Sequence, residues 1–545
     1  MGNRQATANS QPKTIPSSMF KSQKLIEDQI GQTTTNSQTK TIPSSISIGQ
    51  KLIEDQIDES KQNIESNLNI NLSEVLDFSI SAKNTAVKLN KKENQKLPVM
   101  INLSTNKKIE EKKALEFRPP IDLICVIDTS GSMSGNKISL VQQTMNYLLT
   151  IMQQYDRLCL INFESSANRL TGLHLVTPSN KLLFEQSILK LNASGGTNIQ
   201  SGLEMALDVL KNRSYKNKVT SIFLLSDGLD NTQCTLVSRI SQSIEKFAIA
   251  DVFTINSFGF GNDHDPESMR KIAETKDGDF YYIEKLDLVD EFFVAAFGGL
   301  ASIIAENVQI KIQAHPFPIL NDLRICKAYG TYWLYDSNTR IYEFKMNQLM
   351  LGISRELVVE LNIPPCKKNV EDLERNQVFL KGSLELTEIK NKNVIKIEKE
   401  LNLTIYNENE EIPELQKKDN ENVVINYMRV NGAEVIKQAR ELADQGKYEE
   451  SKAAIEEGLK NVDKKYEVNP MIKPLIQDLN DMKEMVNPKE YLGKGQKFFH
   501  GQEKFHSIQK LTSLSPNYEA VYSNMGQERM LQNLRSKKEI LRDYF

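Results

Sequence analysis

The sequence predicts an α/β protein with a doubly wound, Rossmann-like domain, an antiparallel β-sandwich module and a C-terminal helical hairpin. Between residues 118 and 305, short apolar runs alternate with helical segments, which is the pattern of strand–helix units around a parallel sheet. From residue 306 to 410 apolar residues recur at every second position, as in antiparallel strands. From residue 420 to 487 they recur at helical spacing. Two changes in the spacing of apolar residues therefore divide residues 118–487 into three structural regions.

The N-terminal region, residues 1–65, is rich in Gln, Ser, Thr and Asn, so we expect a disordered arm. The arm contains a duplicated segment, because residues 9–30 and 36–57 share KTIPSS and end on KLIEDQI. A duplication without consequence is one interpretation. The other is a tandem docking motif, in which Leu25, Ile26 and Ile30 form the apolar face of a short helix.

The next elements follow from short apolar runs. Residues 70–117 contain two strand-like runs, which we expect to join the β module. In the α/β domain, residues 118–305, the predicted strands are Leu123–Ile127, Leu158–Phe163, Ser221–Leu225, Val252–Phe258 and Phe280–Ile283. The predicted helices are Lys137–Gln154, Lys181–Leu191, Ile199–Leu210, Thr235–Phe247, Pro266–Glu274 and Leu288–Ala305.

Further strands and helices are predicted in the C-terminal half of the chain. In the β module, alternation predicts strands at Val308–Ile312, Arg340–Phe344, Leu357–Leu361, Gln377–Leu386 and Val394–Ile405. Helical spacing on both sides of Gly446 predicts a hairpin of tetratricopeptide-like character, followed by a helix at Met471–Met485. The tail, residues 488–545, gives little signal.

Composition excludes several classes of function. A net charge of −3 offers no global attraction for nucleic acid. The five scattered cysteines form no CxxC pair, which argues against zinc fingers and fits a reducing compartment, so we expect a cytoplasmic protein. We expect neither a secretory signal nor a transmembrane segment. Gly2 would permit myristoylation, a weak lipid anchor, although Ala6 stands where the motif has Ser or Thr.

The most informative motif follows the first strand of the α/β domain. Asp128, Ser130 and Ser132 occupy alternate positions at the end of the apolar run that closes with Ile127. Alternate side chains of an extended segment point the same way, so these oxygens can converge at the sheet edge where open α/β folds bind ligands. Hard oxygen ligands suit Mg²⁺ or Mn²⁺.

Two later segments supply further oxygens. Thr197 lies in a Gly-Gly-Thr-Asn turn that opens a helix, and Asp227 follows the apolar run Ile222–Leu225. Together, Asp128, Ser130, Ser132, Thr197 and Asp227 resemble the metal-ion-dependent adhesion site of von Willebrand factor type A domains. The resemblance implies that the serines and Thr197 coordinate a divalent ion (Mg²⁺, Mn²⁺ or Ca²⁺), and that one aspartate acts through water.

The β module extends the resemblance to intracellular eukaryotic proteins in which a type A domain is followed by a VWA-interaction (Vwaint-like) module. These include plant ubiquitin ligases, whose RING finger has a Cys/His pattern that this chain lacks. The resemblance implies a non-enzymatic, metal-dependent protein that binds a partner's Asp or Glu. An adaptor in ubiquitin transfer and a structural assembly subunit are the alternatives.

An enzymatic function fits the sequence less well than a binding function. The segment from Gly131 to Gly135 has the glycine spacing of a nucleophile elbow, but Met133 stands in the nucleophile's place. It also lacks the GK[ST] ending of a phosphate-binding loop. We therefore expect no catalytic residues in this chain.

Overall fold

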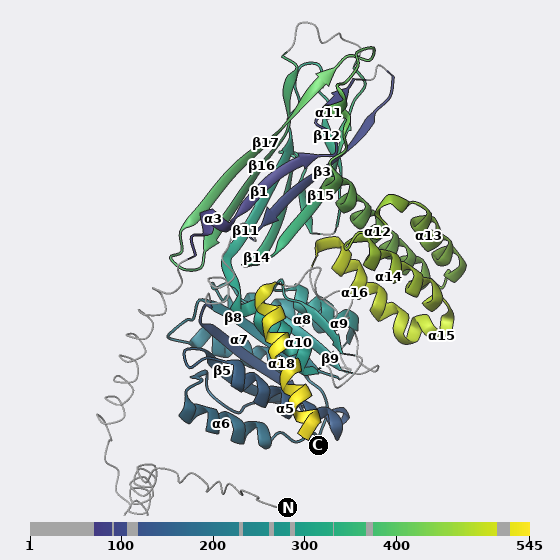
Figure 1. Cartoon of the computed structure of the whole chain (residues 1–545). Helices are drawn as coiled ribbons and strands as arrows, with labels where there is room; N and C mark the ends of the chain where they lie inside the picture. The colour runs from purple at the N-terminus through teal and green to yellow at the C-terminus, as the bar shows by residue number, and fades with distance from the viewer. Residues whose placement is uncertain are drawn as a thin grey trace, which may run out of the picture. The chain divides into compact units, whose positions relative to one another are not determined.

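The computed structural model describes residues 70–89, 92–105, 118–227, 233–260, 266–283, 289–330, 332–366, 374–509 and 524–544 (Figure 1). The duplicated segments of the arm and Gly2 lie outside the described residues. Among the described helices, none is both long and apolar enough to cross a membrane.

The α/β domain is built on a seven-stranded sheet. Its strands are β4 (Ile121–Asp128), β5 (Arg157–Phe163), β6 (Ala167–Arg169), β7 (His174–Leu175), β8 (Val219–Ser226), β9 (Thr254–Phe260) and β10 (Phe280–Ile283). The order is β10-β9-β8-β4-β5-β6, with β7 also on β5. β4 pairs in parallel with β5 and with β8, so the strand order reverses at β4. The predicted fold class is confirmed. The short antiparallel strands β6 and β7 were not predicted.

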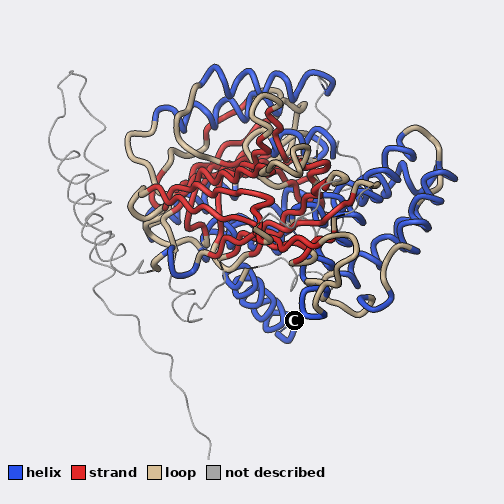
Figure 2. The backbone as a smooth tube through the Cα atoms, turned by 90° about the horizontal axis from the view of Figure 1, so that it is seen from above, coloured by secondary structure: helices blue, strands red, loops and turns tan. Residues whose placement is uncertain are grey.

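Helices cover both faces of this sheet (Figures 1 and 2). They are α5 (Asn136–Ile151), α6 (Pro178–Leu189), α7 (Ile199–Asn212), α8 (Gln233–Phe247), α9 (Pro266–Glu274) and α10 (Val289–Ala301). Side chains of β4 alternate between the two faces: Leu123 and Cys125 pack with α5, α6 and α10, while Ile124 and Val126 pack with α7, α8 and α9. Burial on both faces explains why β4 is apolar without alternation.

The last helix of the domain is shorter than the sequence predicts. The prediction runs to Ala305, but α10 ends at Ala301 and β11 begins at Ile303. The amide and the hydroxyl of Ser302 both donate to the carbonyl oxygen of Gly299, at 3.1 and 2.8 Å, and close the helix. The β-branched residues that follow favour the strand. Apolar character continues across this boundary, so hydrophobicity alone could not locate it.

The β module consists of two sheets around one apolar core. The strands are β1 (Asp77–Ala82), β2 (Ala86–Lys88), β3 (Gln95–Ser104), β11 (Ile303–Ala314), β12 (Arg324–Ala328), β13 (Trp333–Asp336), β14 (Ile341–Met350), β15 (Ser354–Ile363), β16 (Asn376–Glu388) and β17 (Val394–Tyr406); a short helix, α3 (Leu72–Val75), precedes β1. One sheet has the order β1-β3-β15-β12, and the other β13-β14-β11-β16-β17-β2. Pairing is antiparallel except between β17 and β2. Strands from before and after the α/β domain thus share one module.

The remaining helices are α11 (Glu414–Lys417), α12 (Glu421–Asp444), α13 (Tyr448–Lys460), α14 (Ile472–Met485), α15 (Pro488–Glu490), α16 (Gln496–Ile508) and α18 (Met525–Tyr544). Fully buried Arg429 of α12 donates to the carbonyl oxygens of His506 and Glu356, and so ties α12 to α16 and β15. The helix α18 packs on α10, where Gln527 donates to the carbonyl oxygen of Ala295.

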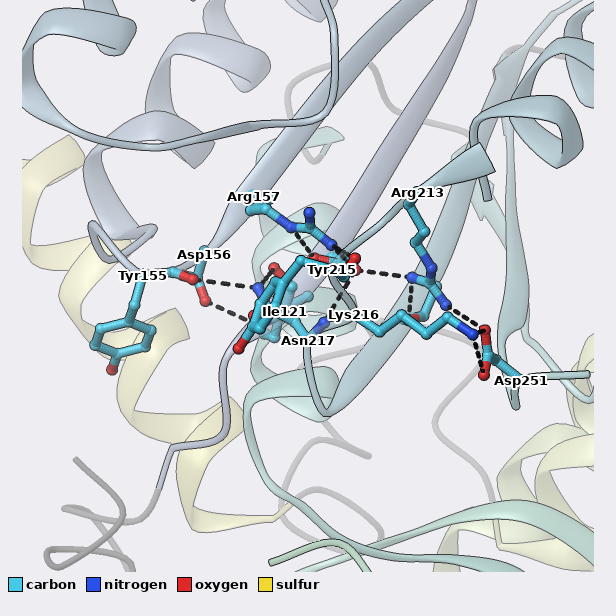
Figure 3. A network of polar contacts seen from close by, with 11 residues as sticks. Ile121, Tyr155, Asp156, Arg157, Arg213, Tyr215, Lys216, Asn217 and Asp251 are labelled. Atoms are coloured by element: carbon cyan, nitrogen blue, oxygen red, sulfur yellow. Dashed lines mark hydrogen bonds and ion pairs between the residues drawn. The ribbon is translucent and has the colours of Figure 1, made fainter. Parts of the chain in front are cut away.

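A buried polar network fixes the beginnings of the parallel strands (Figure 3). Asp122, at the start of β4, accepts hydrogen bonds from Arg157 and Arg213 at 2.6–2.7 Å. Arg213 also pairs with Asp251, and the amide of Asn217 donates to Asp122. Charged groups at this edge are thus paired with one another. The opposite edge of the sheet, where the strands end, carries the predicted site.

Candidate metal site

Two carboxylates lie at the edge where the parallel strands end. Asp128 is the last residue of β4, and Asp227 follows directly after β8. These strands are adjacent and parallel at the point where the strand order reverses, which is where open α/β sheets form a crevice. Asp128 is 0% exposed and Asp227 is 2% exposed.

Asp128 is held by hydrogen bonds from both sides. One carboxylate oxygen accepts from the amide of Ser130 at 2.8 Å, and the other from the hydroxyl of Ser226 at 2.5 Å. Burial raises the pKa of Asp128, these hydrogen bonds lower it, and the negative charge of Asp227 raises it. A buried carboxylate beside a second one is stabilised by a nearby cation.

The two serines connect to the second aspartate. The hydroxyl oxygens of Ser130 and Ser132 are 3.0 Å apart, and the Ser132 hydroxyl donates to Asp227 at 2.8 Å. A 3-10 turn at Gly131–Met133 gives this segment its shape, and the fully buried Met133 anchors the turn in the core. The side chains that the sequence predicted from Asp128 to Ser132 are therefore brought to Asp227.

Thr197 lies on a loop that is hydrogen-bonded to this segment. The amide of Ser194 donates to the carbonyl oxygen of Thr129 at 2.7 Å, and the amide of Gly131 to that of Gly195 at 3.1 Å. These bonds bind the loop to the segment that carries the serines. Thr197 follows Gly195 by two residues and is half-buried. Asn198 then caps α7 through the amide of Ser201.

Gly195 is required where this loop turns. Its φ is +75°, a value that L side chains rarely adopt. An added Cβ would lie 1.7 Å from a carboxylate oxygen of Glu164. The carboxylate of Glu164 thus lies beside the loop, and the neighbouring Ser165 accepts from the amide of Gly196 at 3.2 Å.

The donor set fits a hard divalent cation. Two carboxylates and three neutral hydroxyls are oxygen ligands of the kind that Mg²⁺ and Mn²⁺ take in proteins. Ordinary turn chemistry explains each residue singly, but not why the side chains of Ser130 and Ser132 join the ends of two separate strands, at Asp128 and Asp227.

Two side chains that were not predicted from the sequence contact the carboxylates of the site, and a third lies beside the Gly195 turn. Ser226 donates to Asp128, and Lys137 donates to Asp227 through its ammonium group. Glu164 lies against Gly195. Lys137 follows Ser132 by five residues, in the first turn of the helix that the motif opens, and this spacing could have identified it.

Comparison with known proteins agrees with the fold. The family model of the von Willebrand factor type A domain matches residues 123–229. The chain is 26% identical over 209 residues to the uncharacterized protein YfbK of Escherichia coli, covering 38% of this chain and 36% of YfbK. It is 24% identical over 257 residues to the E3 ubiquitin-protein ligase WAV3 of Arabidopsis thaliana, covering 45% of this chain and 31% of WAV3. The chain thus spans about a third of the length of these two relatives.

A solved structure, the von Willebrand factor type A protein from Catenulispora acidiphila, is similar with a TM-score of 0.55. The similarity covers 80% of this chain and 97% of that protein, at 15% sequence identity, and it shows a shared fold. The family match and this fold lead to one conclusion: the chain contains a von Willebrand factor type A domain.

Proposed function

We propose that this chain binds a partner protein through a divalent cation, Mg²⁺ or Mn²⁺ with Ca²⁺ as a further candidate, held by Asp128, Ser130, Ser132, Thr197 and Asp227. The observation that carries the proposal is the line of contacts from Ser130 through Ser132 to Asp227, beside the buried Asp128. The presence of a von Willebrand factor type A domain implies protein–protein interaction more generally.

The residues of the site suit an acidic partner. When bound, the cation supplies an electrophilic centre that a partner's Asp or Glu carboxylate can approach. The hydroxyls of Ser130, Ser132 and Thr197 contribute oxygen atoms but no charge. Five side chains would fill at most five of the six positions around an octahedral Mg²⁺, which leaves a position for a carboxylate oxygen from outside.

Exposed apolar side chains support a protein partner over a small acid. On α6, Leu182, Leu183 and Leu189 are 60%, 54% and 70% exposed. The helix ends at Leu189, eight residues before Thr197. Exposed leucines grouped on one helix are typical of interaction surfaces. We infer a partner segment with apolar residues beside its acidic residue.

Two further parts of the proposal concern chemistry and location. We propose that the chain is not an enzyme, in part because Met133, at the nucleophile position of the elbow-like segment, is fully buried. We place it in the cytoplasm because the described cysteines Cys125, Cys159, Cys326 and Cys366 are free thiols. Weak lipid anchoring through Gly2 stays a prediction.

The test is capture of partners by the full chain with Mg²⁺, with EDTA, and with the variant Asp128→Asn. Asp251→Asn, which alters a carboxylate at the opposite edge of the same sheet, is the control. We expect a captured partner to be lost with EDTA and with Asp128→Asn but kept with Asp251→Asn, and to depend on an acidic residue of its own. Capture unaffected by EDTA and Asp128→Asn, with the fold intact, would contradict the proposal.

An adaptor role in ubiquitin transfer is the second candidate, since WAV3 and WAVH1 of Arabidopsis thaliana are named E3 ubiquitin-protein ligases. This role predicts that ubiquitin-transfer proteins copurify with the chain whether or not metal is present. A structural assembly subunit would instead form stoichiometric complexes that resist EDTA.

A further inference from the structure

Lys137 places a positive charge inside the candidate metal site. Its ammonium group contacts one carboxylate oxygen of Asp227, and the Ser132 hydroxyl donates to the other. The Lys137 side chain is 22% exposed, whereas that of Asp227 is fully buried. The contact is therefore partly shielded from solvent, where charge interactions are stronger than at an open surface.

Helix stability does not explain a lysine at this position. Lys137 is the second residue of α5, whose first turn contains no acidic residue. A positive charge near a helix N-terminus is unfavourable, because the helix dipole is positive there. The contact with Asp227 is thus the interaction that accounts for Lys137 in this turn.

The charges of the site change sign when a divalent cation enters. Asp128, Asp227 and Lys137 are the charged groups joined by the contacts within the site, and with both aspartates ionised they carry one net negative charge. Glu164 lies beside the Gly195 turn and is not included in this sum. A divalent cation would bring the total to one net positive charge, which a partner's carboxylate would neutralise. Without Lys137, the loaded site would already be neutral and would attract a carboxylate less strongly.

We propose that Lys137 sets the balance between metal and partner. This proposal rests on the proposed function. The ammonium group competes with the cation for Asp227, so it weakens metal binding to the free protein. The same charge strengthens the binding of a carboxylate to the loaded site. Metal and partner therefore bind cooperatively, each raising the affinity for the other.

The test uses the full chain with Mn²⁺ as the metal probe and acetate as the carboxylate probe. Electron paramagnetic resonance measures free Mn²⁺, and water proton relaxation reports displacement of metal-bound water by acetate. For Lys137→Met we expect Mn²⁺ affinity to rise about tenfold and acetate affinity to fall several-fold, since one nearby charge is removed. Lys137→Gln, which keeps a polar end group, is the second variant and should give the same two changes.

Lys216→Met is the matched control, because Lys216 pairs with Asp251 near the beginnings of the strands. It should change neither affinity. Absence of Mn²⁺ binding in the natural sequence, or equal binding by Asp128→Asn, would refute the proposed function itself. Mn²⁺ binding that depends on Asp128 but is unchanged or weakened in both Lys137 variants would overturn only the role of Lys137.

Discussion

At the scale of single residues, Asp128 and Asp227 gain their chemistry from where their strands end. Both are almost fully buried, and each lies where its strand ends. Burial raises the pKa of Asp128, whereas hydrogen bonds from Ser130 and Ser226 favour its charged form. This arrangement keeps a carboxylate pair in a place where a cation would relieve its repulsion.

Gly195 allows a first prediction at this scale. Gly195→Ala should lower stability by about 1–2 kcal/mol through its positive φ. Because alanine disfavours this φ, the substitution should shift the loop that carries Thr197 and weaken Mg²⁺ binding about tenfold, while the Glu164 carboxylate moves aside. Isothermal titration calorimetry and urea denaturation measure the two effects.

Gly446→Ala is the matched control for this variant. Gly446 has a φ of +77° but no atom within 4 Å of an added Cβ, and it lies between α12 and α13. It should lose similar stability without any change in Mg²⁺ affinity. Equal metal affinity in the two variants would argue against a role for the Thr197 loop.

His500 of α16 allows a prediction about pH. Burial, together with the positive charges of Arg440 and Arg270, lowers the pKa of His500 to about 4, against the opposing effects of Asp444 and Glu267. The unfolded chain therefore binds the proton more readily between pH 6.5 and 4. The contribution of neutral His500 to the free energy of unfolding should therefore be full above about pH 6.5, and it should be lost as the pH falls toward 4.

Thermal unfolding between pH 7 and 4 tests this expectation. The variant His500→Gln cannot gain the charge, so its stability should fall less over this range. An identical fall in both proteins would show that His500 does not contribute.

At the scale of elements, periodicity predicted the long segments well. The five parallel strands and the helices between them lie where apolar runs and helical spacing placed them, within a few residues. The strands β6 and β7 were missed because two or three residues show no period. The helix α18 was missed because its apolar residues bury against α10, an element more than 220 residues earlier. The local spacing of apolar residues does not show which distant helix will cover them.

The packing of α18 on α10 yields a prediction. Leu534 of α18 is 2% exposed and belongs to the core that includes Phe297. Leu534→Ala should lower the free energy of unfolding by about 2–4 kcal/mol, since it leaves a cavity under the helix. Leu415, which is 88% exposed, is the control, and Leu415→Ala should change stability by less than about 0.5 kcal/mol. Urea denaturation measures the free energy of unfolding of both variants. Equal values for Leu534→Ala and Leu415→Ala would mean that α18 does not cover this core.

At the scale of the whole chain, the two edges of the seven-stranded sheet have different roles. Near the beginnings of the strands, Lys218 donates to the carbonyl oxygen of Lys390, and the amide of Asn347 donates to Asp277, so this edge joins the β module. The candidate site lies at the other edge. Contact with the β module and partner binding therefore use different ends of one sheet.

The hydrogen-bonded group of Asp128, Ser130, Ser132 and Asp227 was predictable, because each of these residues stands in a short motif at the end of a strand. The role of Thr197 in the site stays a prediction. Lys137 was not predictable, since its role depends on the direction of one long side chain toward Asp227. Sequence pattern gives the place of a backbone segment more readily than the reach of a flexible side chain.

The most direct test of the central claim is anomalous X-ray diffraction from crystals of the full chain soaked in Mn²⁺. We predict one strong anomalous peak at the edge formed by β4 and β8, about 2.1 Å from the hydroxyl oxygens of Ser130 and Ser132, and no peak there in Asp128→Asn. An ordered site without a peak, or a peak that persists in Asp128→Asn, would contradict the account.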